Sequence, residues 1–358
     1  MADISTTKAS RSSRLASGWT RGKSILQRQG ALIALIVLVL FGALRYDNFF
    51  STYNFLTVIS YNTTFGLIAL GMTFVMMTGG IDLSVGSLAA LCSVVAALAS
   101  PFGLLAAIGA AALAGLIVGL FNGWVIAWLR IPPFLATLAM LLAARGMALV
   151  LAKDATVSVN ATADWAGLSQ GVLFGIPLPI ILLLAYAIGS IVLNFTRFGR
   201  HVLAVGGNEE AARLMGLPVE RIKLAVYAIS GLLAGLAGVL LAGQTFTGSP
   251  NEAVGWELTA IAAVVVGGTL LTGGMGSVWG SLVGVLLLGL VFNILNFENG
   301  FGFISMGVSW QSVIRGVFLL IVVLLQSRLT RAKKVRLGQE PSGPLENKSS
   351  PNWKRGLH

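Results

Sequence analysis

The chain has 358 residues, of which 56% are hydrophobic and only 10% are charged. A soluble domain carries about 25% charged residues, so this composition excludes two ordinary soluble domains despite the length of the chain. The net charge of +11 would suit a nucleic-acid-binding protein, but here the basic residues flank long apolar runs, which is typical of an integral membrane protein.

Most of the positive charge lies in three stretches. Six Lys and Arg residues fall within the first 30 residues, five fall within residues 196–223, and eight follow Gln326. Cytoplasmic loops of membrane proteins carry an excess of Lys and Arg. We therefore expect both termini and the 196–223 loop to be cytoplasmic in the inner membrane, with the lipid bilayer as a partner and no nucleic acid. Segments 153–176, 245–256 and 297–309 hold only one basic residue, Lys153, and are expected to face outward.

The apolar runs predict an all-α polytopic membrane protein with about ten transmembrane helices, some of them broken or re-entrant. A run of roughly 20 apolar residues spans the hydrocarbon core. The first run is short, and it reaches the far interface only if Tyr46, Phe49 and Phe50 form an aromatic belt and Arg45 snorkels. The predicted spans lie near 31–50, 58–78, 84–100, 104–129, 134–152, 177–195, 224–244, 257–273, 277–296 and 310–326.

These spans divide the chain into a disordered basic tail at 1–24, a membrane domain at 25–327 and a basic tail at 328–358. Glycines recur at a spacing of four residues, which predicts helix faces where neighbouring backbones approach closely. They lie at 115, 119 and 123, at 231 and 235, and at 276, 280 and 284. The single cysteine, Cys92, excludes an intrachain disulfide.

An internal repeat marks two predicted interruptions of apolar spans. Thr78-Gly79-Gly80 recurs as Thr272-Gly273-Gly274, and Gly86-Ser87-Leu88 recurs at the same offset as Gly280-Ser281-Leu282. Paired glycines disfavour a helix interior, and transporters often contain internal repeats with discontinuous helices. We therefore place Gly79, Gly80, Gly273 and Gly274 on a candidate translocation path.

The first interruption also carries Asp82 and Ser84. An ionisable residue between apolar spans is a functional candidate, and irregular backbone is tolerated where it lines a cavity. The alternative is a turn in which Asp82 and Ser84 cap the following helix. Further polar candidates for the path are Thr137, Asn293, Asn122 and Asn296. Arg145 and Arg315 are expected to face the bundle interior or an aqueous cavity, or else to cap a helix end or form a structural pair.

Residues 196–223 predict a short helix that projects from the membrane domain. Asn208 suits an N-cap, and Glu209 and Glu210 are favourable in a first turn. Gly216 and Pro218 are expected to end the helix after about two turns. A short, firmly terminated helix can dock into a partner's groove, although an ordinary surface helix has the same pattern.

The motif search indicates no catalytic residues, metal ligands or cofactor site. Gly18–Ser24 approximates a phosphate-binding loop, but it has three residues between the glycines instead of four and no preceding strand. The two histidines, His201 and His358, have no ligand partners at metal-binding spacing. We expect the chain to bind no ATP, so uphill transport requires a partner or an ion gradient.

The loop sequence Glu210-Ala211-Ala212-Arg213-Leu214-Met215-Gly216 resembles the E-A-A loop of permease subunits of ATP-binding-cassette (ABC) importers. Together with GMTFVMMTGGIDLSVGS and LTAIAAVVVGGTLLTGGMGSVWGS, it resembles the ribose/xylose/galactofuranose branch of monosaccharide permeases over residues 55–326. The resemblance implies a fold similar to type II importers, with Glu210, Ala211, Ala212 and Gly216 in a coupling helix.

The resemblance also implies the partners: a second permease subunit, an ATPase with two nucleotide sites that binds ATP and Mg²⁺, and a periplasmic sugar-binding protein. It implies inverted halves, whereas the repeat above is offset by an even number of spans and predicts parallel ones. The alternatives are a related permease for a nucleoside, an amino acid or a sugar-like signal, an ion-coupled secondary transporter, and an intramembrane enzyme.

Overall fold

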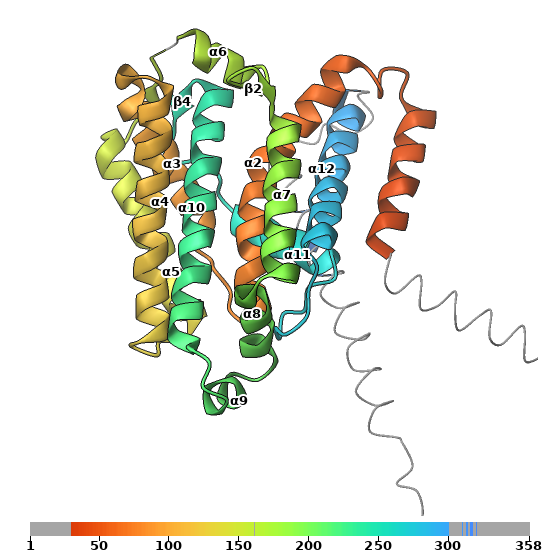
Figure 1. Cartoon of the computed structure of the whole chain (residues 1–358). Helices are drawn as coiled ribbons and strands as arrows, with labels where there is room; N and C mark the ends of the chain where they lie inside the picture. The colour runs from red at the N-terminus through yellow and green to blue at the C-terminus, as the bar shows by residue number, and fades with distance from the viewer. Residues whose placement is uncertain are drawn as a thin grey trace, which may run out of the picture.

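The computed structural model describes residues 30–160 and 162–300, together with positions 310, 313, 316, 317 and 320. The tails predicted at 1–24 and 328–358, Arg315 and most of the span predicted at 310–326 lie outside the described residues. Within them, seven helices are long and apolar enough to cross a bilayer, so the predicted count of ten spans is not confirmed. The seven, shown in Figure 1, are α2 (Thr52–Met77), α3 (Val85–Ala99), α4 (Leu104–Ala127), α5 (Pro133–Ala152), α7 (Leu178–Phe195), α10 (Val219–Thr245) and α12 (Val278–Gly300).

Shorter elements connect these helices. Two are apolar: an N-terminal helix, Gly30–Arg45, and α11 (Trp256–Val266). The strands form two small antiparallel pairs, β1 with β4 and β2 with β3. The remaining elements are η1 (Ser100–Phe102), β1 (Val157–Ser158), α6 (Ala163–Ser169), β2 (Val172–Leu173), β3 (Ile176–Pro177), α8 (Arg197–Gly207), α9 (Glu209–Leu214) and β4 (Thr247–Gly248).

The helix α10 forms the centre of the bundle and packs against α2, α3 and α4. Its glycines face those of α4: a Cβ at Gly115 would lie 2.9 Å from the Cα of Gly235, and one at Gly119 would lie 3.1 Å from the Cα of Gly231. Such distances leave no room for side chains, so the two backbones are in contact. The predicted packing role of these glycines is confirmed.

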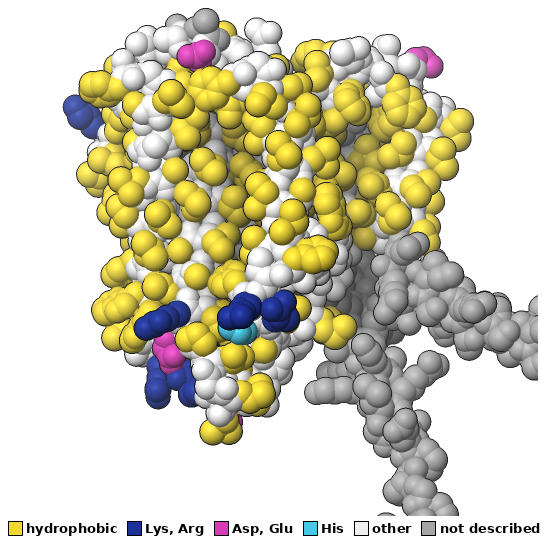
Figure 2. All heavy atoms as spheres, in the orientation of Figure 1, with side chains coloured by type: hydrophobic (Ala, Val, Ile, Leu, Met, Phe, Trp, Pro, Cys, Tyr) yellow, Lys and Arg dark blue, Asp and Glu magenta, His cyan; other side chains and the backbone are white. Residues whose placement is uncertain are grey.

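The outer helices expose apolar side chains. Only 28%, 22% and 28% of the most apolar window is buried in α4, α5 and α7, against 78% in α2. Figure 2 shows hydrophobic side chains covering most of the visible flank of the molecule. Helices that border lipid need no polar outer face, so the exposure pattern fits a bundle surrounded by hydrocarbon.

The span predicted at 257–273 is wrong, because α11 has only 11 residues. After β4 the chain turns back into the bundle along α3: a Cβ at Gly248 would lie 2.6 Å from the Cα of Val94, and one at Gly86 would lie 2.7 Å from the carbonyl oxygen of Ala253. Eight helical residues separate these two points of α3, or ~12 Å. The helix α11 therefore begins inside the bundle, as a re-entrant half-helix.

The first predicted span is also shorter than expected. Its helix ends at Arg45, and the aromatic residues that follow are not a belt at the interface. Tyr46 and Phe49 are buried, and the ring of Tyr46 stacks on Phe297 of α12 with centroids 4.8 Å apart. The Tyr46 hydroxyl donates to Glu298 at 2.6 Å. These contacts attach the N-terminal helix to α12, while Phe50 alone stays largely exposed.

The two ends of the bundle carry different elements. At one end, α6 and the paired strands β1 and β4 join the α5–α6 connection to the segment after α10. At the opposite end, α8 and α9 extend beyond the long helices (Figure 1). This places 153–176 and the 196–218 connection at opposite ends, as the charge pattern predicts.

Candidate translocation and coupling site

The first interruption separates α2 from α3 as predicted. The helix α2 ends at Met77, and Gly79 follows with φ +79°, a left-handed conformation that favours glycine. Ser84 is the N-cap residue of α3, and its side chain makes no capping bond. Instead, Asp82 Oδ1 accepts from the Ser84 amide at 3.0 Å and from the Ser84 hydroxyl at 2.6 Å. The carboxylate thus stabilises the turn that starts α3.

Asp82 is also the centre of a polar network that joins several helices. Ser230 of α10 donates to its Oδ2 at 2.9 Å, and Asn122 of α4 donates to the Ser84 hydroxyl at 3.0 Å. Asp82 is 1% exposed, and Ser84 is fully buried. A buried carboxylate requires such partners. The network fixes the break against α4 and α10, and exposure of Asp82 to a translocation path stays a prediction.

Two further predicted path residues lie in different places. The Thr137 hydroxyl of α5 lies 3.2 Å from the carbonyl oxygen of Ile81 and 2.9 Å from that of Pro133, so it belongs with the first break. Asn293 of α12 bonds to Asn54 of α2 at 2.6 Å. Asn296, also on α12, is exposed. The structure therefore groups Thr137 with Asp82 and separates both from Asn293.

The second interruption, between α11 and α12, packs directly on the first. Gly273 and Gly274 both have positive φ, and the Gly274 amide donates to the carbonyl oxygen of Met77 at 3.0 Å. A Cβ at Gly273 would lie 2.9 Å from the Cα of Gly79. The helices before the two breaks therefore arrive at the same end of the bundle, so these two repeat units run in the same direction.

A third glycine pair, at the end of α8, completes this contact. A Cβ at Gly206 would overlap the carbonyl oxygen of Met77, and one at Gly274 would lie 2.8 Å from the Cα of Gly207. We call these residues the glycine junction: Gly79, Gly206, Gly207, Gly273 and Gly274. It brings both membrane breaks into backbone contact with the loop predicted to couple to a partner.

That loop folds into two short helices. Thr196 caps α8 by accepting from the Gly199 amide, and Asn208 caps α9 by accepting from the Ala211 amide at 2.9 Å. Gly216, with φ +79°, ends α9, and Pro218 is the N-cap residue of α10. The predicted cap and stop residues are confirmed. The helix α9 has only six residues, slightly shorter than predicted.

Ion pairs hold α9 against the start of α10. Glu209 lies 2.7 Å from Lys223 and 3.5 Å from Arg213, and Arg213 also pairs with Glu220. The hydrogen bond to Glu220 raises the pKa of Arg213, so its positive charge is maintained. Glu209 therefore orients the helix, whereas Glu210 lies in the same first turn without an ion pair among the described residues.

The tip of α9 exposes two apolar residues that the sequence pattern did not single out. Leu214 is 89% exposed and Met215 is 70% exposed, whereas Ala212 is buried beneath them. Around the tip, Lys and Arg side chains gather at this end of the molecule (Figure 2). Exposed apolar side chains on a fixed helix are available for contact with another protein. A helix of six residues is too short for its apolar periodicity to predict which side chains are exposed.

Arg145 of α5 is the other charged residue predicted to lie inside the bundle. Its guanidinium donates to the carbonyl oxygens of Pro250 and Glu252, the second at 2.8 Å. These carbonyls belong to the re-entrant segment before α11. The contact supports the structural interpretation of Arg145, because irregular backbone inside a membrane protein needs polar partners.

Comparison with known proteins agrees with this architecture. A family model described as "Branched-chain amino acid transport system / permease component" matches residues 54–323. The ribose import permease protein RbsC of Escherichia coli K12 is 37% identical over 314 residues, covering 86% of this chain and 95% of the relative. The L-arabinose ABC transporter permease protein AraH of Azospirillum brasilense is 37% identical over 303 residues, covering 84% of this chain and 87% of that protein.

A third relative, the xylose transport system permease protein XylH of Haemophilus influenzae, is 33% identical over 361 aligned positions, covering 83% of this chain and 95% of the relative. The residues matched by the family model include both membrane breaks and the α8–α9 loop. The chain therefore belongs to the family of multi-pass membrane permeases that serve as the transport subunits of ABC importers.

Proposed function

We propose that this chain forms the translocation pathway for a monosaccharide in an ABC importer, and that α9 couples it to a separate ATPase. The named cargoes of its relatives, ribose, arabinose and xylose, support a pentose or a similar sugar. In this proposal ATP and Mg²⁺ bind to the partner ATPase, and a periplasmic binding protein delivers the sugar to a pair of permease subunits.

The observation that carries the proposal is the position of α9. It is capped at Asn208, terminated at Gly216 and tipped by exposed Leu214 and Met215. The residue before its cap, Gly207, belongs to the glycine junction. A movement of α9 on a partner is thereby transmitted to the two membrane breaks through backbone contacts, without a flexible linker.

The orientation of the chain in the membrane follows from the charges at the α8–α9 end of the molecule. Arg197, Arg200, Arg213, Arg221 and Lys223 lie on or beside α8 and α9. Positively charged loops remain in the cytoplasm, where an ATPase is available. We infer that α9 faces the cytoplasm, that the β1–β4 end faces the periplasm, and that both termini are cytoplasmic.

The test is uptake into liposomes that contain the permease, its ATPase and its binding protein. We expect accumulation of D-ribose, L-arabinose or D-xylose only when ATP and all three components are present. Accumulation without the ATPase, abolished by a protonophore, would show an ion-coupled transporter instead. The family description also names branched-chain amino acids, so leucine uptake in place of sugar uptake would redirect the cargo assignment.

The coupling role is tested by substitutions in α9. Gly216→Leu places a branched side chain at a positive φ, and Glu210→Lys reverses a first-turn charge. We expect both to abolish sugar-stimulated ATP hydrolysis while the permease still inserts. A matched control is Asp164→Lys, because Asp164 occupies the first turn of the short helix α6 at the opposite end. Stimulated hydrolysis that survives both α9 changes would refute the coupling role.

A further inference from the structure

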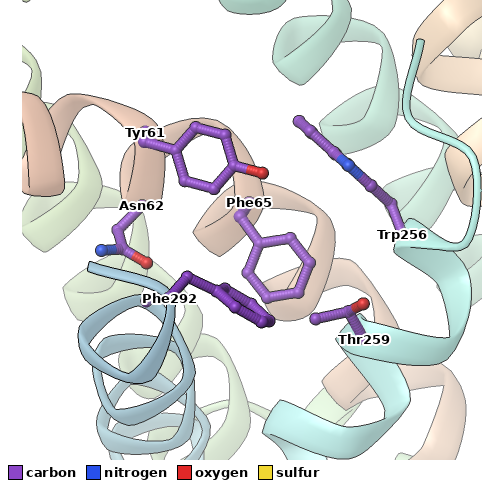
Figure 3. A pocket seen from close by; sticks show the side chains of 7 residues that line it. Tyr61, Asn62, Phe65, Trp256, Thr259 and Phe292 are labelled. Atoms are coloured by element: carbon purple, nitrogen blue, oxygen red, sulfur yellow. The ribbon is translucent and has the colours of Figure 1, made fainter. Parts of the chain in front are cut away.

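A pocket lies between α2, α11 and α12, and none of the predicted path residues lines it. Its lining consists of three aromatic residues around Trp256, an amide, a hydroxyl and a glycine. Its interior has room for about one water molecule, and the pocket is partly open to the surface. The lining residues are Tyr61, Asn62, Phe65, Trp256, Thr259, Gly289 and Phe292 (Figure 3).

The re-entrant half-helix supplies one of the buried aromatic residues of the pocket. Trp256 is the first residue of α11, which begins inside the bundle, and its side chain is buried. Tyr61 and Phe65 of α2 meet its ring edge to face, with centroids 5.9 Å and 6.0 Å apart. Tyr61 is 39% exposed and lies at the mouth. The aromatic wall thus runs from the surface to the start of α11.

Asn62 provides the polar feature that points to a ligand. It is 1% exposed, and its Nδ2 donates to the carbonyl oxygen of Val58 at 2.7 Å. Its Oδ1 has no hydrogen-bond partner among the described residues, and Figure 3 shows this oxygen on the pocket side of the amide. An unpaired buried acceptor is destabilising, so it calls for an explanation such as a bound donor.

The backbone opposite Asn62 is shaped to admit this amide. A Cβ at Gly289 would overlap both the Oδ1 and the Nδ2 of Asn62, so any larger residue at 289 would displace the amide. Glycine at this position holds the oxygen against the pocket without supplying a donor. Among the described residues none donates to this acceptor, so it is left for a molecule that enters the pocket.

We propose that this aromatic–amide pocket is a contact site for the transported monosaccharide, an inference that rests on the proposed function. A sugar has an apolar C–H face, which suits an aromatic wall, and a rim of hydroxyl donors, one of which would donate to Asn62 Oδ1. Ligand sites combine apolar walls with a few placed polar groups. A pocket this narrow holds one edge of a sugar, so the contact is weak and release is fast.

The experiment uses the complete importer in liposomes and a series of D-ribose analogues, each lacking one hydroxyl. Asn62→Leu keeps the branched shape of the side chain and removes the acceptor. We expect it to lower D-ribose uptake about tenfold, the value of one good hydrogen bond. The analogue that lacks the donating hydroxyl should be taken up equally fast by this variant and by the wild-type protein. Gly289→Ala, which displaces the amide, should show the same selective loss.

The control is Asn194→Leu, because Asn194 is an exposed amide on α7; it should change neither rate. If Asn62→Leu fails to insert, the smaller Asn62→Ala replaces it. Equal losses for every analogue, or unchanged uptake of D-ribose, would overturn the sugar contact while leaving the proposed function intact. Failure of the wild-type complex to take up any sugar would instead refute the proposed function itself.

Discussion

The two Thr-Gly-Gly interruptions share a sequence but are held in place by different physical means. At the first, Asp82 and Ser84 bind α4 and α10 through buried side-chain hydrogen bonds. At the second, Gly273 and Gly274 contact Met77, Gly79 and Gly207 through backbone atoms alone. One break therefore depends on the side chains that are present, and the other depends on the absence of side chains.

This difference assigns the breaks different parts in transport. The first is anchored inside the bundle by a fully engaged carboxylate. The second lies between the first break and α8, where any movement of the α8–α9 loop reaches it directly. Substitutions that act on one break at a time test whether the two breaks are held in these different ways.

The largest effect is expected for Gly206→Ala in the glycine junction. The new methyl group would overlap the carbonyl oxygen of Met77 and lie 2.5 Å from the Gly274 amide nitrogen. Backbone cannot move aside as a flexible side chain can, so we expect a loss of about 3 kcal/mol in unfolding free energy. The measurement is thermal unfolding in detergent, with ATP-driven uptake alongside.

Its control is the neighbouring Gly207→Ala, whose Cβ would meet nothing within 4 Å. We expect this variant to unfold at the wild-type temperature. Equal stability of the two variants would show that the junction is loosely packed.

The next largest effect is expected for Asp82→Ala at the first break. It leaves the Ser84 amide, the Ser84 hydroxyl and the Ser230 hydroxyl without their acceptor. Unpaired donors destabilise the fold, but removal of the buried carboxylate also recovers its desolvation cost, so we expect a net loss of about 2 kcal/mol in unfolding free energy. We expect lower thermal stability and loss of sugar uptake, with membrane insertion and ATPase assembly retained.

Asp82→Asn separates charge from hydrogen bonding, because the amide oxygen still accepts from Ser84. We expect it to recover most of the lost stability. Normal uptake by Asp82→Ala would reject Asp82 as a path residue.

A smaller effect is expected for Gly79→Ala. The nearest atom to its Cβ would be the Thr272 carbonyl oxygen at 3.5 Å, so space is available. The cost arises only from the left-handed backbone, about 1–2 kcal/mol for an L-residue. Gly79→Asn should cost less, because Asn tolerates this conformation. If thermal unfolding ranks Asn below Ala, contacts rather than backbone conformation limit this position.

The smallest effect is expected for Ser230→Ala, which removes one of the three donors to Asp82. One hydrogen bond contributes about 1 kcal/mol, and two donors from Ser84 remain. We expect a modest fall in unfolding temperature and near-normal uptake. A loss as large as that of Asp82→Ala would show that the α10 contact, rather than the turn at Ser84, anchors the first break.

Much of this architecture follows from local sequence. Paired glycines predicted both breaks, Asn208 predicted the cap of α9, and Gly216 predicted its end, because each acts through its own backbone and immediate neighbours. The charge pattern likewise predicted which connections share an end of the bundle. Hydropathy failed at α11, since the apolar run continues through Gly267 and Gly268 although the helix ends at Val266.

The candidate site was predicted less completely than the fold. Asp82, Ser84, Thr137 and Asn122, all candidates from the sequence, do lie together, but nothing in their spacing shows that Ser230 completes the network. Asn293 pairs with Asn54 instead. Leu214, Met215 and the pocket residues around Trp256 were missed, because exposure and burial depend on neighbours that are distant in the chain.

Composition and local residue patterns were sufficient to predict that this protein crosses a membrane, where its backbone is interrupted and which loop carries the capped helix. These properties depend on composition and on conformational preferences within a few residues. The packing of the helices brings five glycines from three segments together, places Arg145 against a re-entrant segment and turns Asn62 towards a pocket. Such contacts join residues up to about 230 positions apart, and their formation depends on how whole helices pack.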